Sequence, residues 1–239
     1  MRIILIINLY INYKKMTEML DFEYDEPRIP LIWEQAPEFK APSTQWEINF
    51  PEDYKGKWVI LFSHPADFTP VCTTEFMAFQ EKKEEFDKRN VELIGYSVDW
   101  LHSHIAWVKN IKEKFGVDIT FPIVAHPQIA YKYGMLHPSA DNSHTVRAVF
   151  IINPDGKIAA LMYYPLSNGR NIEEIIRLID SLQTTYNHGR ATPANWPNNQ
   201  IFGDKVIVPP AESLEQADKN ESTYECKDWY ICTQKNPNK

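Results

Sequence analysis

Hydrophobic positions in the central part of the chain change repeatedly between the period of a strand and the period of a helix. Residues 58–62 form a continuous apolar run, which is typical of a strand buried on both faces, and residues 91–98 predict a second strand. Between these strands, apolar residues recur at helical spacing at positions 72, 76, 79 and 86. A further helical pattern over 105–115 predicts another helix, which Gly116 is suited to end.

The next part of the chain predicts a short strand and a hairpin. Residues 121–124 contain Pro122, whose missing N–H favours the edge of a sheet or the start of a strand. Residues 147–152 and 157–163 flank the sequence Asn-Pro-Asp-Gly, which is a strong turn signal. We therefore expect two neighbouring antiparallel strands joined by this turn.

One more helical pattern, with apolar residues from 172 to 182, closes the body of the chain. Asn171 is a favoured N-cap residue, and Glu174 follows it at the spacing of a capping box. Strands and helices thus alternate before a hairpin and a last helix. This order predicts an α/β fold with a mixed sheet and helices on both faces.

The N-terminal part differs from this body. Residues 17–56 are punctuated by prolines and are predicted to be mostly irregular. Residues 1–15 contain an apolar run that is too short to span a bilayer and is not followed by a small-residue cleavage site. We expect either that Met16 is the true start or that residues 1–15 are a dispensable extension.

The C-terminal part also differs from the body. Beyond residue 186 the chain is rich in proline and has few apolar runs apart from 206–208, which predicts an arm rather than a second core. We therefore expect three parts: an N-terminal extension over 1–28, a core domain over 29–186 and a C-terminal arm over 187–239.

Composition narrows the classes of function. The chain has 239 residues with 25 basic and 32 acidic side chains, and its net charge of −7 argues against a nucleic-acid partner. It has only 8 glycines and no Gly-rich phosphate loop. Its 3 cysteines cannot form a complete disulfide framework, which fits a reducing, cytoplasmic location. We expect no membrane partner.

Cys72 is predicted to lie in the first turn of a helix. Thr69 and Pro70 form a helix-start signal, with Thr69 as the N-cap and Pro70 as the first helical residue. The unpaired amides and the positive dipole end of such a turn favour a thiolate. No cysteine stands three residues before or after Cys72, so the disulfide exchange of a CxxC motif is excluded. A lone thiolate remains, and it can act as a nucleophile or be oxidised to a sulfenic acid. The alternative is a small buried hydrophobic side chain.

The sequence around this cysteine resembles a known family. The spacing Pro65-x-x-x-Thr69-x-x-Cys72 is similar to the active-site signature of the peroxiredoxins, and the longer string FSHPADFTPVCTTE is similar to their one-cysteine subgroup. The resemblance continues through VRAVFIINPDGKI and into the Pro-rich arm, and it covers residues 29–230. A long co-linear match is far less likely to arise by chance than one short motif.

The resemblance implies a thioredoxin-like fold with a C-terminal extension and a thiol-dependent peroxidase, an oxidoreductase of antioxidant defence and redox homeostasis. Cys72 would attack hydrogen peroxide or an organic hydroperoxide and become a sulfenic acid. Thr69 would hydrogen-bond the thiolate and the peroxide, Pro65 would shield the thiolate from water, and Arg147 would complete the site. The alternative class is a non-catalytic thioredoxin-like redox sensor or holdase chaperone.

Four charged or titratable residues are candidates for the site. Arg147 suits a transition state whose negative charge spreads over sulfur and oxygen, because a guanidinium keeps its proton and presents several donors. The alternative is that Arg147 forms an ion pair at the surface. Glu75 either orients Arg147 or Thr69 or only complements the helix dipole. His64 either contacts the sulfur or substrate or hydrogen-bonds the backbone. Arg170 corresponds to a second family arginine, or serves only its own loop.

No cofactor or metal is expected. His102 and His104 are two residues apart near a predicted helix start, which is not the spacing of a metal-binding pair on one helix face, and no cysteine or carboxylate is spaced in sequence to complete a zinc site.

The other two cysteines, Cys226 and Cys232, leave the fate of the sulfenic acid open. They could have no role, pair with each other, or form a disulfide with Cys72. The Val-Cys-Pro context of a two-cysteine peroxiredoxin is absent from the arm. We therefore favour an external thiol, glutathione or a thioredoxin-type protein, as the reductant.

Two further expectations rest on the resemblance. The one-cysteine subgroup is linked to a phospholipase activity through a serine just before the first core strand, but Lys57 stands there in this chain, and lipase chemistry needs a hydroxyl nucleophile. We expect no such activity by that route. The arm of the family packs across a second subunit, and the apolar residues of this arm suit that use, so we expect a homodimer.

Overall fold

The computed structural model describes residues 28–141 and 143–239, so the expectation for Met16 and residues 1–15 lies outside the described residues. The strands and helices follow one another in this order along the chain: β1 (Phe39–Pro42), β2 (Glu47–Phe50), η1 (Glu52–Tyr54), β3 (Trp58–Ser63), α2 (Pro70–Glu81), α3 (Lys83–Lys88), β4 (Val91–Ser97), α4 (Leu101–Phe115), β5 (Ile123–Ala125), α5 (Pro127–Lys132), β6 (Arg147–Ile152), β7 (Ile158–Tyr164), α6 (Ile172–His188), β8 (Val206–Ile207), α7 (Leu214–Thr223), β9 (Glu225–Asp228) and β10 (Ile231–Gln234).

A mixed sheet of five strands forms the centre of the body, in the order β5-β4-β3-β6-β7. Strand β3 is parallel to β4 and antiparallel to β6, and β6 and β7 form the expected hairpin. All six residues of β3 are buried, because its two faces are both covered. Strand β5, which begins directly after Pro122, lies at the edge of the sheet, in agreement with the expectation for this proline.

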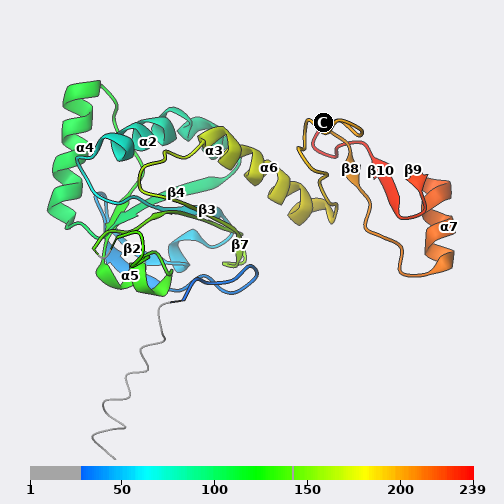
Figure 1. The fold of residues 1–239 in the computed structure, drawn as a ribbon, viewed down its shortest axis with the longest axis horizontal. Coiled ribbons are helices and arrows are strands. Elements are labelled where there is room, and N and C mark those ends of the chain that lie inside the picture. The colour runs from blue at the N-terminus through cyan, green and yellow to red at the C-terminus, as the bar shows by residue number, and fades with distance from the viewer. Residues whose placement is uncertain (1–27, 142) are drawn as a thin grey trace, which may run out of the picture.

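Side chains from alternate positions of β3 enter two different cores. Trp58, Ile60 and Phe62 join the core formed with α2, α4 and α6. Val59 and Leu61 point the other way, into the core formed with β1, β2, η1 and α5. Figure 1 shows the corresponding layers, with the long helices on one side of the sheet and β2 and α5 on the other. This two-sided arrangement is the α/β architecture that the alternating pattern predicts.

The described part of residues 17–56 is mostly irregular, as the prolines predict, but it also contains a short hairpin that the sequence did not predict. Strands β1 and β2 form an antiparallel hairpin in which Phe39 pairs with Phe50. Every second residue of both strands is buried against the second core. Pro42 ends the short strand β1 and does not interrupt it, so a proline in this region is compatible with a strand end.

Gly116 and Asn171 lie at helix boundaries, as expected, whereas one predicted helical pattern is divided and the short helices α5 and α7 were not predicted. Gly116 adopts a left-handed conformation, with φ of 71°, at the end of α4. The Asn171 side chain caps α6 by accepting from the backbone of Glu173 and Glu174. The apolar pattern from 72 to 86, by contrast, is divided at Lys82 into α2 and α3.

The C-terminal arm has more regular structure than the sequence predicts. Strands β8, β10 and β9 form a small antiparallel sheet, and α7 lies beside it. Figure 1 shows this unit beyond the C-terminal end of α6, standing away from the body. A disulfide between Cys226 and Cys232 joins β9 to β10. Within the described ranges, no helix has both the length and the apolar character needed to cross a membrane.

Candidate active site

The loop after β3 delivers Cys72 to the start of a helix. Pro70 is the first residue of α2, so Cys72 is the third, and its free thiol is fully buried. Thr69 occupies the N-cap position, but its hydroxyl donates to the carbonyl of Ala66 at 2.8 Å and does not cap the helix. The Thr69 hydroxyl, which was expected to donate to the thiolate, therefore donates to a backbone carbonyl of the loop in this structure. Pro65 is buried in the same loop.

Arg147 is the cationic partner of Cys72. It is the first residue of β6, which lies beside β3, and its Nη1 donates to the Cys72 sulfur at 3.3 Å. The same guanidinium is held by the carbonyl of Leu166, which accepts from Nε at 2.9 Å and from Nη2 at 2.6 Å. Its side chain is buried, so the surface ion pair considered as the alternative is not what the structure has.

Glu75 holds two buried arginines in place. It lies one turn after Cys72 on α2 and accepts from Nη1 of Arg147 at 2.6 Å. Arg170 donates to it through its backbone N, its Nε and its Nη2, at 2.7 to 2.8 Å. The remaining nitrogen of Arg170, Nη1, donates to the carbonyls of Ser63 and Ala148. Glu75 thus orients both arginines and does not serve only the helix dipole.

The charges of this cluster do not cancel. Burial by itself would raise the pKa of Glu75, but the charge and hydrogen bonds of Arg170, with the charge of Arg147, hold that pKa below its ordinary value. An ionised Glu75 compensates one of the two arginines, and one positive charge remains in a buried site. This excess favours a negative charge on the Cys72 sulfur, which Arg147 contacts.

The ring of His64 hydrogen-bonds a carboxylate and neither the backbone nor the Cys72 sulfur, and its contact with the substrate stays a prediction. Its Nε2 lies 2.8 Å from Oδ1 of Asp67, and Nδ1 of His104 lies 2.8 Å from Oδ2 of the same carboxylate. All three side chains are buried. The three residues are of metal-binding types and lie within reach of one another, although their sequence spacing gave no sign of it. Hydrogen bonds account for the arrangement, and the absence of a metal stays a prediction.

Asp67 was missed in the sequence analysis, and His104 was considered there only as a metal ligand, not as the partner of Asp67. Asp67 stands inside the motif around Cys72, where its acidic side chain in an otherwise apolar stretch was the available signal. His104 is 37 residues away and reaches Asp67 only because α4 packs beside α2. No local spacing rule connects these two positions.

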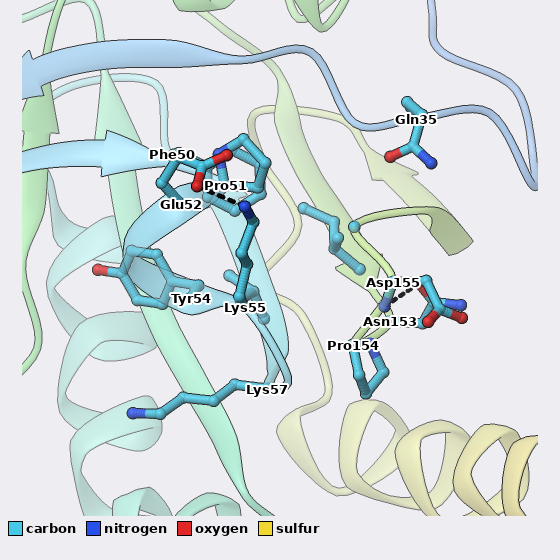
Figure 2. Close-up of a pocket in the computed structure, with 13 residues that line it drawn as sticks. Gln35, Phe50, Pro51, Glu52, Tyr54, Lys55, Lys57, Asn153, Pro154 and Asp155 are labelled. Carbon is cyan, nitrogen blue, oxygen red and sulfur yellow. Dashed lines mark hydrogen bonds and ion pairs between the residues drawn. The ribbon is translucent and has the colours of Figure 1, made fainter.

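A separate cavity of about 490 Å³ lies at the other end of β3. Figure 2 shows Lys55 and Lys57, which precede the strand, together with the turn residues Asn153 to Asp155. Because β3 has six residues, this cavity and the Cys72 loop are about 20 Å apart along the strand. Tyr54 carries the one hydroxyl among its lining residues, and none of them is a histidine. These residues offer no serine nucleophile, and the lack of phospholipase activity stays a prediction.

Comparisons with known families and structures agree with this geometry. Residues 32–161 match the AhpC/TSA family, and residues 181–223 match the C-terminal domain of 1-Cys peroxiredoxin. A peroxiredoxin of Aquifex aeolicus is 56% identical over 216 residues, covering 87% of this chain and 97% of the relative. A peroxiredoxin of Ignicoccus hospitalis is 55% identical, covering 88% of this chain and 90% of the relative.

Two solved structures share the fold. The yeast mitochondrial 1-Cys peroxiredoxin has a TM-score of 0.74 and 40% identity, covering 87% of this chain and 100% of that chain. The peroxiredoxin 6 of Arenicola marina has a TM-score of 0.76 and 37% identity, covering 87% of this chain and 99% of that chain. The predicted thioredoxin-like fold with a C-terminal extension is therefore confirmed. The chain belongs to the peroxiredoxin family, whose members are thiol-dependent peroxidases, and it resembles the one-cysteine subgroup.

Proposed function

We propose that this protein reduces hydrogen peroxide and organic hydroperoxides at Cys72, and that it serves antioxidant defence and redox homeostasis. The observation that carries the proposal is the contact between Arg147 Nη1 and the Cys72 sulfur in a buried site with an excess of positive charge. The Cys72 thiolate attacks one peroxide oxygen, the O–O bond breaks, and water or an alcohol leaves with the peroxide proton. The product on the protein is a sulfenate, which becomes the sulfenic acid by taking up one proton from solvent.

Arg147 stabilises the negative charge that develops on the peroxide oxygens in the transition state. Negative charge passes from sulfur to the two oxygens as the O–O bond breaks, and a guanidinium fixed by Glu75 and Leu166 needs no reorganisation to receive it. Arg147 stays protonated throughout, because a guanidinium does not lose its proton in proteins. Arg170 acts through Glu75 and positions Arg147.

The sulfenic acid is then reduced by an external thiol. Cys226 and Cys232 pair with each other in the arm, which leaves Cys72 as the free thiol and supports a one-cysteine cycle. The yeast mitochondrial relative is described as resolved through the glutathione and thioredoxin systems. We extend that chemistry to this chain, with glutathione or a thioredoxin-type protein as the reductant in a cytoplasmic setting.

Peroxide consumption tests the proposed function. We expect the wild-type protein to consume hydrogen peroxide rapidly with glutathione or thioredoxin as reductant, and Cys72→Ser to consume none. Double replacement of Cys226 and Cys232 by serine is the matched control and should retain turnover. Slow sulfenylation of Cys72 without turnover, under every reductant tried, would instead support a redox sensor or holdase. Loss of turnover in the double variant would contradict the one-cysteine cycle.

The arm supports a second expectation, that the protein is a homodimer. Leu214, Trp229 and Tyr230 are exposed on a unit that stands away from the body, and a second subunit would cover such apolar surface. Light scattering at micromolar concentration should give twice the monomer mass. A chain truncated after residue 190 should give the monomer mass, and a wild-type monomer would be evidence against the dimer.

A further inference from the structure

Asp67 joins the loop that carries Cys72 to the helix α4. Its carboxylate lies 2.8 Å from His104 Nδ1, and its backbone N donates to Oδ2 of Asp99, just before α4, at 2.9 Å. The following residue, Phe68, has φ of 55°, a left-handed conformation that a non-glycine residue adopts only when its surroundings hold it. Asp67 therefore anchors the loop two residues before Thr69, the N-cap of the Cys72 helix.

The carboxylate of Asp67 also decides which nitrogen of each imidazole carries a proton. An ionised carboxylate only accepts hydrogen bonds, so His64 must donate from Nε2 and His104 from Nδ1. The other two nitrogens, Nδ1 of His64 and Nε2 of His104, are buried and have no hydrogen-bond partner. Burying an unpaired lone pair at these two nitrogens costs much less free energy than burying an unpaired N–H of a cationic ring. The hydrogen-bond count thus places the donating proton of each ring on the nitrogen that faces Asp67.

Aromatic packing fixes the plane of the His64 ring. The ring stacks on Trp107 of α4 at a centroid distance of 5.0 Å and meets the edge of Phe76 of α2 at 4.7 Å. Phe76 lies one helical turn after Cys72, in the same buried cluster. Burial lowers the pKa of His64, although the hydrogen bond to Asp67 opposes that shift, which agrees with a neutral ring.

We propose that Asp67 and His104 are positioning residues of the peroxidatic site. His104 holds Asp67, and Asp67 fixes the tautomer of His64 and the path of the loop from His64 to Thr69. Neither residue touches the substrate. They act by keeping the start of α2, and so the Cys72 sulfur, aligned with Arg147. A misplacement of about 1 Å in such a site can slow a reaction on the order of a hundredfold.

Conservative variants of His104 separate this role from simple space-filling. The amide nitrogen of asparagine corresponds to Nδ1, whereas that of glutamine corresponds to Nε2, so His104→Asn can donate to Asp67 and His104→Gln cannot. We expect oxidation of Cys72 by hydrogen peroxide, followed by stopped-flow tryptophan fluorescence, to be about tenfold or more slower in His104→Gln. His104→Asn should recover most of the loss. His102→Asn, at an exposed position of α4, is the control and should match the wild type.

Nitrogen NMR of the histidine rings supplies a readout that does not depend on peroxidase activity. The wild-type protein should show a proton on Nε2 of His64 and on Nδ1 of His104, the two nitrogens that face Asp67. In Asp67→Asn the amide offers one acceptor and one donor, so one of the two rings should switch tautomer, and Cys72 oxidation should slow with it. These signals test the hydrogen-bond assignment even if the proposed peroxidase function fails.

Three outcomes would overturn the proposal. The first is a His64 signal from the Nδ1–H tautomer in the wild type. The second is a His104→Gln variant that folds and oxidises Cys72 as fast as His104→Asn. The third is stoichiometric zinc or iron in the purified protein that is lost in Asp67→Asn, because the three side chains would then be metal ligands.

Discussion

Replacing Arg147 with alanine is expected to slow the oxidation of Cys72 by hydrogen peroxide by about 10²–10³-fold. The substitution removes the donor 3.3 Å from the Cys72 sulfur and the positive charge that faces it. Arg170 remains, but Glu75 then neutralises it, so the buried cluster loses its excess positive charge. Stopped-flow tryptophan fluorescence measures the rate constant directly, before any external reductant is involved.

Two control variants show whether the effect belongs to the site. Arg147→Lys keeps the charge but cannot donate to both Glu75 and Leu166 through a planar fork, so its rate should fall between those of wild type and alanine. Arg177→Ala removes a partly exposed arginine of α6 and should leave the rate unchanged. An Arg147→Ala rate within twofold of wild type would mean that this guanidinium does not stabilise the transition state.

Replacing Glu75 with alanine is expected to lower the free energy of unfolding by about 3–5 kcal/mol. Glu75 is the carboxylate between Arg147 and Arg170, and its side chain is 2% exposed. Without it, two buried guanidiniums face each other with no compensating charge, and the bonds to Nε and Nη2 of Arg170 are lost. Urea denaturation followed by circular dichroism gives the difference.

The matched control is an ion pair of the same residue types at the surface. Glu174 pairs with Arg177 within one turn of α6, where both side chains are partly exposed. Glu174→Ala should cost about 0–1 kcal/mol, because solvent screens the pair. Equal losses in the two variants would show that burial does not decide the strength of these interactions.

The sequence by itself determined the elements whose signals are local. Alternation and apolar runs predicted β3, β4 and the β6–β7 hairpin, and Thr69-Pro70 predicted the helix start that carries Cys72. The short hairpin of β1 and β2 was not predicted. In each strand the alternation of buried and exposed residues extends over only four residues, and the prolines nearby indicate irregular structure.

Only the tertiary structure decided which side chains meet. Arg147 lies 75 residues from Cys72 and reaches it because β6 is placed beside β3 in the sheet. Arg170 lies 95 residues from Glu75, and His104 meets Asp67 across the packing of two helices. Spacing rules describe one strand or one turn of helix, whereas these contacts depend on strand order and helix packing. The local sequence thus determined the thiol and its helix, and the fold decided the charges around it.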